Sequence, residues 1–165
     1  MTVPCLIAVD PGAKGAIAFL TENGELIDVV DMPSVIVRVN RKDRVRVAEQ
    51  ALALLIAANR PLHAFVELSG PMPTDGSQQA YGMGLAAGLV RGVLAGLGIP
   101  ITLIPPVVWK RGMGLTADKG ACRQRAMQLF PARADLFARV KDAGRAESLL
   151  IGVYGLRTWQ RDAAG

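Results

Sequence analysis

The chain has 165 residues, of which 51% are hydrophobic and 20% charged, so a disordered chain is excluded and one domain with a sizeable core is expected over residues 1–165. The two cysteines, Cys5 and Cys122, have neither the spacing of a metal site nor that of a disulfide framework, and no basic region precedes the first apolar run. Both features favour the cytoplasm. The single histidine argues against chemistry based on histidine pairs, whereas 14 Asp and Glu residues leave carboxylate chemistry open.

The expected elements alternate between apolar strands and helices. In chain order, the sequence predicts strands at 3–9, 15–20 and 25–31, a helix at 45–59, a strand at 63–68, a helix at 80–97, a strand at 101–104, and helices at 107–113, 117–129 and 145–158. Asn23-Gly24 predicts a hairpin between the second and third strands. No helix or strand is expected in the polar segment 32–42. A cluster of basic residues begins in this segment and ends at Arg46. This order implies an α/β fold with a mixed five-stranded sheet flanked by helices.

The helix expected at 80–97 carries glycines at every fourth position, at 84, 88, 92 and 96, so they form one stripe along it. Each glycine costs about 1 kcal/mol of helix propensity, which indicates that the stripe serves close packing. Two contacts are open, the sheet and the same helix in a second subunit. Arg91 and Pro100 interrupt the apolar run and argue against a membrane span.

Positive charge is concentrated in residues 110–145. This tract has nine Lys or Arg and three Asp, a net charge of +6, and the remainder of the chain has a net charge of −1. A local basic face suggests a polyanion as partner, and nucleic acid is the commonest polyanion. The alternative is the solvated surface of a helix.

Two of the expected strands end in a carboxylate, Asp10 and Glu67. If these strands lie side by side and parallel, both acids emerge at the same sheet edge, roughly 4.8 Å apart. Two like charges at that separation require a cation or a proton between them, and ligation by oxygen alone favours Mg²⁺ or Mn²⁺. Glycines at 12 and 15 would let a phosphate or metal approach the backbone. The alternative to a cation site is that Asp10 starts an ordinary turn and that both acids are solvated.

Glu147 is a third candidate, in the first turn of the last helix. One explanation is that an acid in that position only stabilises the helix, through its favourable interaction with the helix dipole. Its neighbours Ala146, Leu149 and Leu150 should pack inward, however, which would bring the Glu147 side chain near the buried edge.

Together these residues resemble a known family, the RuvC-type Holliday junction resolvases, and in particular the compact RuvC-like proteins of phages and bacteria. The similar motifs are Asp10-Pro11-Gly12 with Gly15-Ala16, Val66-Glu67, Pro105-Pro106-Val107-Val108-Trp109-Lys110, Asp118-Lys119, and Lys141-Asp142 followed by Gly144-Arg145-Ala146-Glu147. The match runs from about residue 5 to residue 152. The order and spacing of the motifs are more specific than any one of them.

The resemblance implies an RNase H-like fold and a homodimer that resolves four-way DNA junctions by hydrolysis assisted by Mg²⁺, with Mn²⁺ possible. Asp10, Glu67 and Glu147 match three of the family's four metal-binding positions, with Glu147 where Asp is usual. Relatives often carry Asp or His at the position of Ala143, which lies about 40° from Glu147 around a helix. Asp142 is the remaining candidate if it precedes the helix; otherwise it is a helix cap.

The resemblance also implies phosphate contacts from the basic tract, and the candidates are Lys110, Arg111, Lys119, Arg123, Lys141 and Arg145. Trp109 and Tyr81 would either stack on opened bases or belong to the core. Three other functions stay open: a branched-DNA-binding protein with weak or no cleavage, an RNase H-like nuclease acting on RNA such as the YqgF-like proteins, and an ATP-binding relative of the sugar kinase and actin group. The last requires a second, duplicated domain, for which 165 residues are too few.

Overall fold

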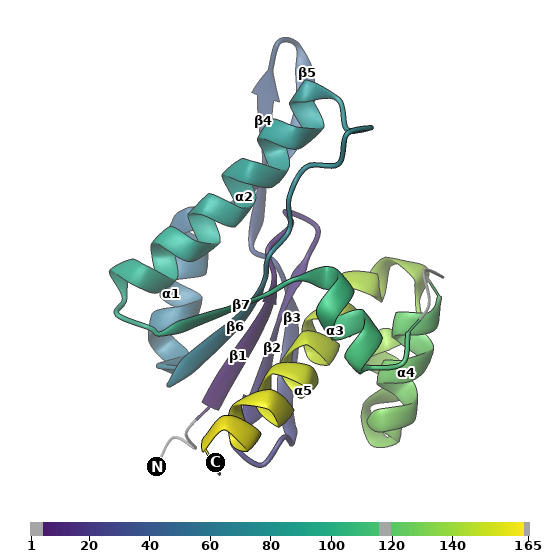
Figure 1. The fold of residues 1–165 in the computed structure, drawn as a ribbon. Coiled ribbons are helices and arrows are strands. Elements are labelled where there is room, and N and C mark those ends of the chain that lie inside the picture. Colours follow the sequence, from purple (N-terminus) through teal and green to yellow (C-terminus); the bar gives the residue numbers. More distant parts are fainter. Residues whose placement is uncertain (1–4, 116–119, 164–165) are drawn as a thin grey trace.

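The computed structural model describes residues 5–115 and 120–163 (Figure 1). Its strands are β1 (Cys5–Asp10), β2 (Ala16–Thr21), β3 (Leu26–Asp31), β4 (Ser34–Val39), β5 (Lys42–Val47), β6 (His63–Glu67) and β7 (Ile101–Ile104). Its helices are α1 (Glu49–Asn59), α2 (Ser77–Gly96), α3 (Pro106–Gly112), α4 (Ala121–Leu129) and α5 (Ala143–Ala163), with short 3₁₀ helices η1 (Pro131–Phe137) and η2 (Val140–Asp142).

The central sheet has five strands in the order β3-β2-β1-β6-β7. β2 is antiparallel to both β1 and β3, whereas β6 is parallel to both β1 and β7. The mixed five-stranded sheet flanked by helices is therefore confirmed, and each of its strands lies where an apolar run predicted it. β1 and β2 are buried along almost their whole length, which explains why their sequences are continuously apolar instead of alternating.

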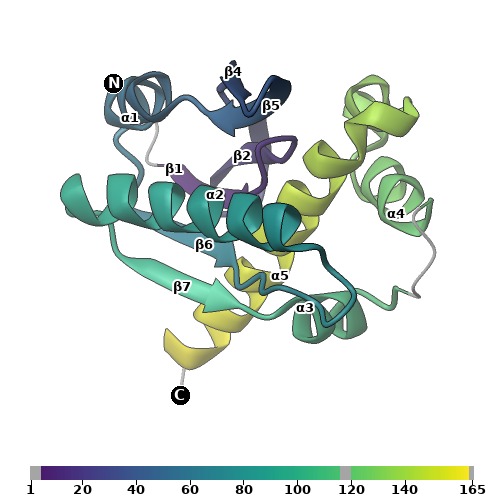
Figure 2. The ribbon, with the colours of Figure 1, turned by 90° about the horizontal axis from the view of Figure 1, so that it is seen from above.

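Helices cover both faces of the sheet, because successive side chains of a strand point to opposite faces. Leu6 and Ala8 of β1 pack on the face covered by α5, whereas Ile7 and Val9 pack on the face covered by α1 and α2. Figure 2 shows α1 and α5 on opposite sides of the sheet. A Cβ at Gly152 of α5 would lie 2.5 Å from the Leu20 side chain, so this glycine lets α5 lie close against the sheet.

Residues 34–47 form a separate two-stranded hairpin, which the sequence analysis did not predict. The expected helix at 45–59 was wrong at its start, because residues 45–47 belong to β5 and α1 begins at Glu49. Valines alternate with other residues through this segment, which is the period of a strand. Asn40 and Arg41 turn the chain with φ values of 50° and 61°, as a tight hairpin requires.

The glycine stripe of α2 does not pack on the sheet. Ala86, Val90 and Leu94 are the buried residues of this helix, and the glycines at 84, 88, 92 and 96 have open space where a Cβ would be. The sheet is therefore excluded as the contact of the glycine stripe, and the same helix in a second subunit is the expected contact that remains. No helix within residues 5–115 and 120–163 is both long enough and apolar enough to cross a membrane.

Candidate active site

Asp10 and Glu67 lie at the same edge of the sheet. β1 and β6 are parallel and Val9 pairs with Val66, so the next residue of each strand is one of the two acids. A Cβ at Gly15 would collide with the Asp10 backbone, so the loop after β1 turns tightly around Asp10. The Gly12 N–H donates to Oδ1 of Asp10 at 3.4 Å. The shared edge expected from parallel strands is therefore present.

Helix α5 brings Glu147 to this edge. A Cβ at Gly144 would lie only 2.9 Å from the Lys14 carbonyl oxygen, so glycine lets the start of α5 pack against the loop after β1. Because α5 begins at Ala143 and not at Arg145, Glu147 lies in the second turn of the helix, which corrects the expected first-turn position. The residues at 146, 149 and 150 are buried, as expected, which leaves Glu147 at the rim of the core.

Burial and neighbouring charges disfavour the charged forms of Asp10 and Glu147. Burial, followed by repulsion from Glu147 and Glu67, raises the pKa of Asp10 to about 7. Burial is also the main cause of the raised pKa of Glu147, to which Glu67 adds, while Lys110 acts in the opposite direction. A cation at this edge would relieve the repulsion that the protons otherwise relieve.

Two donors hold Glu67 in place. The indole Nε1 of Trp109 donates to its Oε2 at 2.8 Å, and the Ser69 hydroxyl donates to its Oε1 at 2.6 Å. Trp109 is fully buried in α3, so of its two possible roles the core position is correct. Tyr81 is not a core residue, since 61% of it is exposed.

Lys110 and Cys122 flank Glu147. The Lys110 Nζ lies 3.7 Å from Oε1 of Glu147 and 5.2 Å from the centre of the Trp109 ring. The Cys122 Sγ lies 3.9 Å from the same carboxylate oxygen, and burial raises the pKa of this thiol to about 11. Cys122 is therefore a neutral thiol near pH 7. Sequence reasoning missed Cys122 and Ser69 as neighbours of the carboxylates, because neither carries a motif.

Asp142 does not join the carboxylates. It precedes α5, but it is buried and its oxygens accept hydrogen bonds from the Arg139 backbone N–H at 2.9 Å and from the Arg139 guanidinium at 2.9–3.2 Å. The guanidinium hydrogen bonds are the main reason that the pKa of Asp142 is lowered. In the structure Asp142 is therefore a cap residue, and its expected role as a metal ligand stays a prediction.

The predicted phosphate contacts divide into three groups. Arg145 forms a two-pronged pair with Asp31 of β3, at 2.6 and 2.7 Å, and Arg123 donates to the Ala138 carbonyl at 2.8 Å, so both stabilise the fold. Lys110 lies beside Glu147, and Arg111 and Lys141 are exposed. Lys119, with Asp118, lies outside the described residues.

The donor chemistry at the edge suits a hard divalent cation, since Asp10, Glu67 and Glu147 offer oxygen ligands and their charges repel one another. Within the described part of the chain, however, no three His, Cys, Asp or Glu side chains converge into a ready ligand group.

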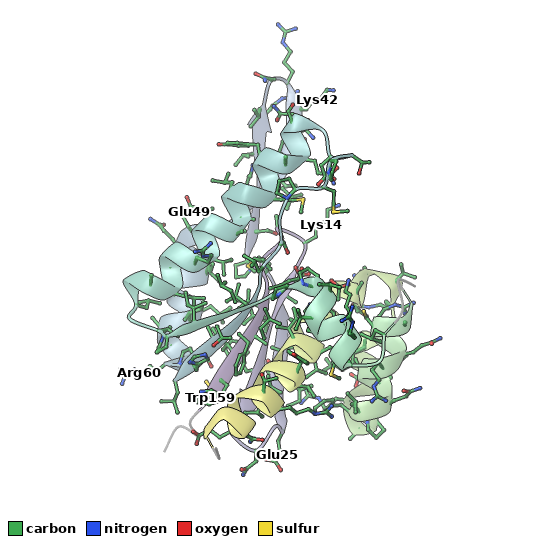
Figure 3. The ribbon with its side chains drawn as sticks, viewed as in Figure 1. Lys14, Glu25, Lys42, Glu49, Arg60 and Trp159 are labelled. Carbon is green, nitrogen blue, oxygen red and sulfur yellow. The ribbon has the colours of Figure 1, made fainter. Side chains whose placement is uncertain are left out.

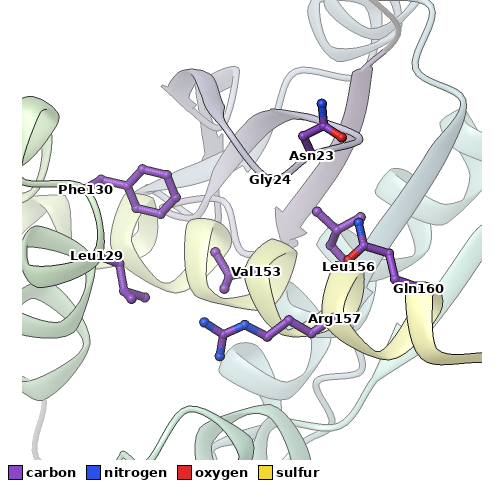
Figure 4. Close-up of a pocket in the computed structure, with 8 residues that line it drawn as sticks. All are labelled: Asn23, Gly24, Leu129, Phe130, Val153, Leu156, Arg157 and Gln160. Atoms are coloured by element: carbon purple, nitrogen blue, oxygen red, sulfur yellow. The ribbon is translucent and has the colours of Figure 1, made fainter.

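A separate cavity of about 220 Å³ lies between the β2–β3 turn, the end of α4 and α5 (Figure 4). Its lining, which includes Asn23, Leu156 and Gln160, holds no carboxylate.

Fold and site together define an RNase H-like α/β protein with three carboxylates at one sheet edge. Solved structures narrow the class to the RuvC fold. "T. thermophilus RuvC in complex with Holliday junction substrate" matches with a TM-score of 0.56 and 13% identity, over 93% of this chain and 96% of that chain. "Thermus thermophilus RuvC structure" matches with a TM-score of 0.55 and 14% identity over the same shares. The resemblance seen in the motifs is confirmed at the level of the fold.

One curated relative is similar in sequence. "Holliday junction resolvase MOC1, chloroplastic" from Chlamydomonas reinhardtii is 34% identical over 97 residues. The aligned region covers 58% of this chain and 11% of that relative, so the chain spans a small part of its length. No protein-family model matches the chain.

Proposed function

We propose that this chain is an endonuclease that resolves four-way DNA junctions, with residues 1–165 acting as one RNase H-like nuclease domain. The observation that carries this proposal is the sheet edge that Asp10 and Glu67 share, where burial, followed by repulsion from Glu147 and Glu67, raises the pKa of Asp10 to about 7. The RuvC fold and the names of the similar proteins support four-way junctions as the substrate. The cytoplasmic location stays a prediction.

The cofactor we propose is Mg²⁺, with Mn²⁺ as a substitute, held by Asp10, Glu67 and Glu147. Such a cation supplies Lewis acidity for the scissile phosphate and lowers the pKa of a bound water. Trp109 and Ser69 orient the Glu67 carboxylate through the hydrogen bonds described above. Lys110 offsets the charge of Glu147 and lies where it can also contact a phosphate, while the exposed Arg111 and Lys141 provide further phosphate contacts.

A homodimer through α2 would place two such sites on one junction. The glycine stripe and the side chains between its members form an open groove, lined by Gly84, Leu85, Gly88, Leu89, Gly92 and Val93. A second copy of α2 fits this groove because glycines let two helix backbones approach closely. Twofold symmetry would then present the sites to symmetry-related DNA strands.

The experiment is an incubation of the protein with a labelled immobile four-way junction and with the matching linear duplex, in Mg²⁺, Mn²⁺ or EDTA. We expect paired, symmetric nicks in the junction alone, lost in EDTA and in the variant Asp10→Asn. Metal-dependent cleavage that survives Asp10→Asn would contradict the proposed site. A structured RNA and an RNA–DNA hybrid belong in the same assay, because preferential cleavage of either would favour an RNA nuclease.

A second candidate is a protein that binds branched DNA and cuts it weakly. The position of Ala143 favours it, because Ala143 lies one helical turn before Glu147, offers no carboxylate, and the neighbouring Asp142 is engaged by Arg139. Ala143→Asp separates the two candidates. If the unaltered chain shifts the junction without cutting it and Ala143→Asp cuts, the missing carboxylate limits cleavage. Equal cutting by both would show that three carboxylates suffice.

A further inference from the structure

The β4–β5 hairpin leaves the sheet at the same end as the carboxylates. Asp10 pairs with Ala16, Ala16 pairs with Asp31 at the end of β3, and β4 begins three residues later. In Figures 1 and 3 the hairpin projects beyond the sheet, with Lys42 near its tip and Arg60 at the opposite end of the molecule. Nucleic acid lying across the carboxylate edge would therefore meet this hairpin.

The hairpin is strongly basic. Residues 34–47 contain five cations and one anion, Asp43, a net charge of +4. The cations are Arg38, Arg41, Lys42, Arg44 and Arg46. None of the ion pairs found within residues 5–115 and 120–163 involves any of them. Cations held this close together repel one another, and a bound polyanion would remove that repulsion.

Strand register places three of the cations on one face, which we call the basic face. Lys42, Arg44 and Arg46 of β5 pair with the valines at 39, 37 and 35 of β4, and paired residues point to the same side. Side chains on one face of a strand repeat about every 6.8 Å. This repeat is close to the distance between neighbouring phosphates along one DNA strand, so the row matches a phosphate backbone.

Helix α2 supports the basic face at its base. The Arg46 guanidinium lies 5.9 Å from the centre of the Tyr81 ring, and a Cβ at Gly82 would lie 3.2 Å from Nη1 of Arg46. Val37, Val39 and Leu85 line a depression beside this contact. Arg46 therefore anchors the hairpin to α2, whereas Lys42 and Arg41 are exposed beyond it.

We propose that the basic face, with Arg41 at the turn, binds the phosphate backbone of a duplex arm of DNA as it leaves the carboxylate edge. This inference rests on the proposed function and adds a DNA-binding surface outside the basic tract of residues 110–145. Each strand has six residues, so the hairpin extends about 20 Å, the length of about six base pairs. The contacts are to phosphates and carry no sequence preference.

The test is the double variant Lys42→Gln with Arg44→Gln, measured by junction binding over a range of salt concentrations and by cleavage at saturating DNA. We expect binding about 10-fold weaker near 0.1 M salt, and a slope of log K against log[salt] that is smaller by about 1.8. The cleavage rate at saturation should stay within about twofold, because neither residue lies at the carboxylates.

Two further variants serve as controls. Asp43→Asn raises the charge of the hairpin and should tighten binding, whereas a damaged hairpin would weaken it. Arg60→Gln removes one charge at the opposite end of the molecule and should leave binding unchanged (Figure 3). Binding that falls equally in the Asp43 variant and the double variant overturns the inference.

The failures of the two proposals are distinguishable. If the unaltered chain cuts junctions, and the double variant binds them with the same affinity and salt slope, the inference alone falls. The hairpin cations would then serve only to keep its edges from pairing with other chains. If the unaltered chain binds no DNA, the proposed function falls with it.

Discussion

The Trp109 indole and the Glu67 carboxylate, 42 residues apart in the sequence, are joined by a hydrogen bond of 2.8 Å from Nε1 to Oε2. The bond connects α3 to the end of β6, and Trp109 is fully buried while Glu67 lies at the rim of the sheet. The buried indole therefore fixes the orientation of a carboxylate that must itself stay accessible.

We predict that Trp109→Phe slows cleavage about 10-fold at saturating junction while junction affinity stays unchanged. Phenylalanine fills most of the same space but donates no hydrogen bond, and a bond to a charged group contributes about 1.5–3 kcal/mol. Single-turnover cleavage rates test this. The matched control is Trp159→Phe, which changes the chain's other tryptophan, stacked on His63 away from the carboxylates. Equal rates in the two variants would contradict a positioning role for Trp109.

The raised pKa of Asp10 predicts how stability depends on pH in the absence of metal. Its pKa is about 7 in the folded protein and 3.8 in its ordinary state, so the folded protein binds more protons than the unfolded chain between these values. The free energy of unfolding should therefore decrease as the pH rises from about 4 to 7. Asp10→Asn should remove this decrease and stabilise the protein at pH 8 by up to about 4 kcal/mol.

Urea unfolding in EDTA at pH 5 and pH 8 measures this difference. Asp10→Asn should also lose metal-dependent cleavage. Removal of the Asp10 carboxylate would then explain both the loss of activity and the gain in stability. A variant no more stable than the unaltered chain at pH 8 would show that burial and the neighbouring carboxylates do not raise the pKa of Asp10.

Asp142 and Glu147 should respond in opposite ways to substitution. Asp142→Ala removes a cap and should lower the free energy of unfolding by about 0.5–2 kcal/mol while metal-dependent cleavage persists. The pKa of Asp142 is lowered in the folded protein, so its contribution to stability is present above its ordinary pKa and is lost as the pH falls below it. Glu147→Gln should abolish cleavage without loss of stability, because burial and Glu67 disfavour its charge.

Urea unfolding combined with a Mn²⁺ titration of cleavage separates the two roles. If Asp142→Ala keeps full stability but no longer responds to Mn²⁺, Asp142 is a ligand and its hydrogen bonds with Arg139 do not persist when metal binds.

Gly88→Leu tests the dimer. A Cβ at Gly88 meets nothing within 4 Å, so the larger residue fits the monomer, and leucine favours a helix by about 1 kcal/mol relative to glycine. We expect a dimer for the unaltered chain and a monomer of equal or greater stability for the variant, measured by sedimentation equilibrium. A dimer that persists in Gly88→Leu would show that the groove on α2 is not the interface.

Sequence alone determined the features that depend on neighbouring residues. The five strands of the sheet are apolar runs bounded by turn residues, and Asp10 and Glu67 end two of them, so their shared edge follows once the strands are parallel. The β4–β5 hairpin was also visible locally, in the alternating valines of residues 35–47. It was missed because its arginines and lysines were interpreted as a polar loop.

Only the tertiary structure decided which partner each side chain has. Arg145 pairs with Asp31 across 114 residues, and Trp109 donates to Glu67 across 42 residues, although local patterns were consistent with other roles for both. The physical reason is that the period of a helix or strand is set by bonds between near neighbours. The partner of a charged or polar side chain depends instead on which segments the packed core brings together.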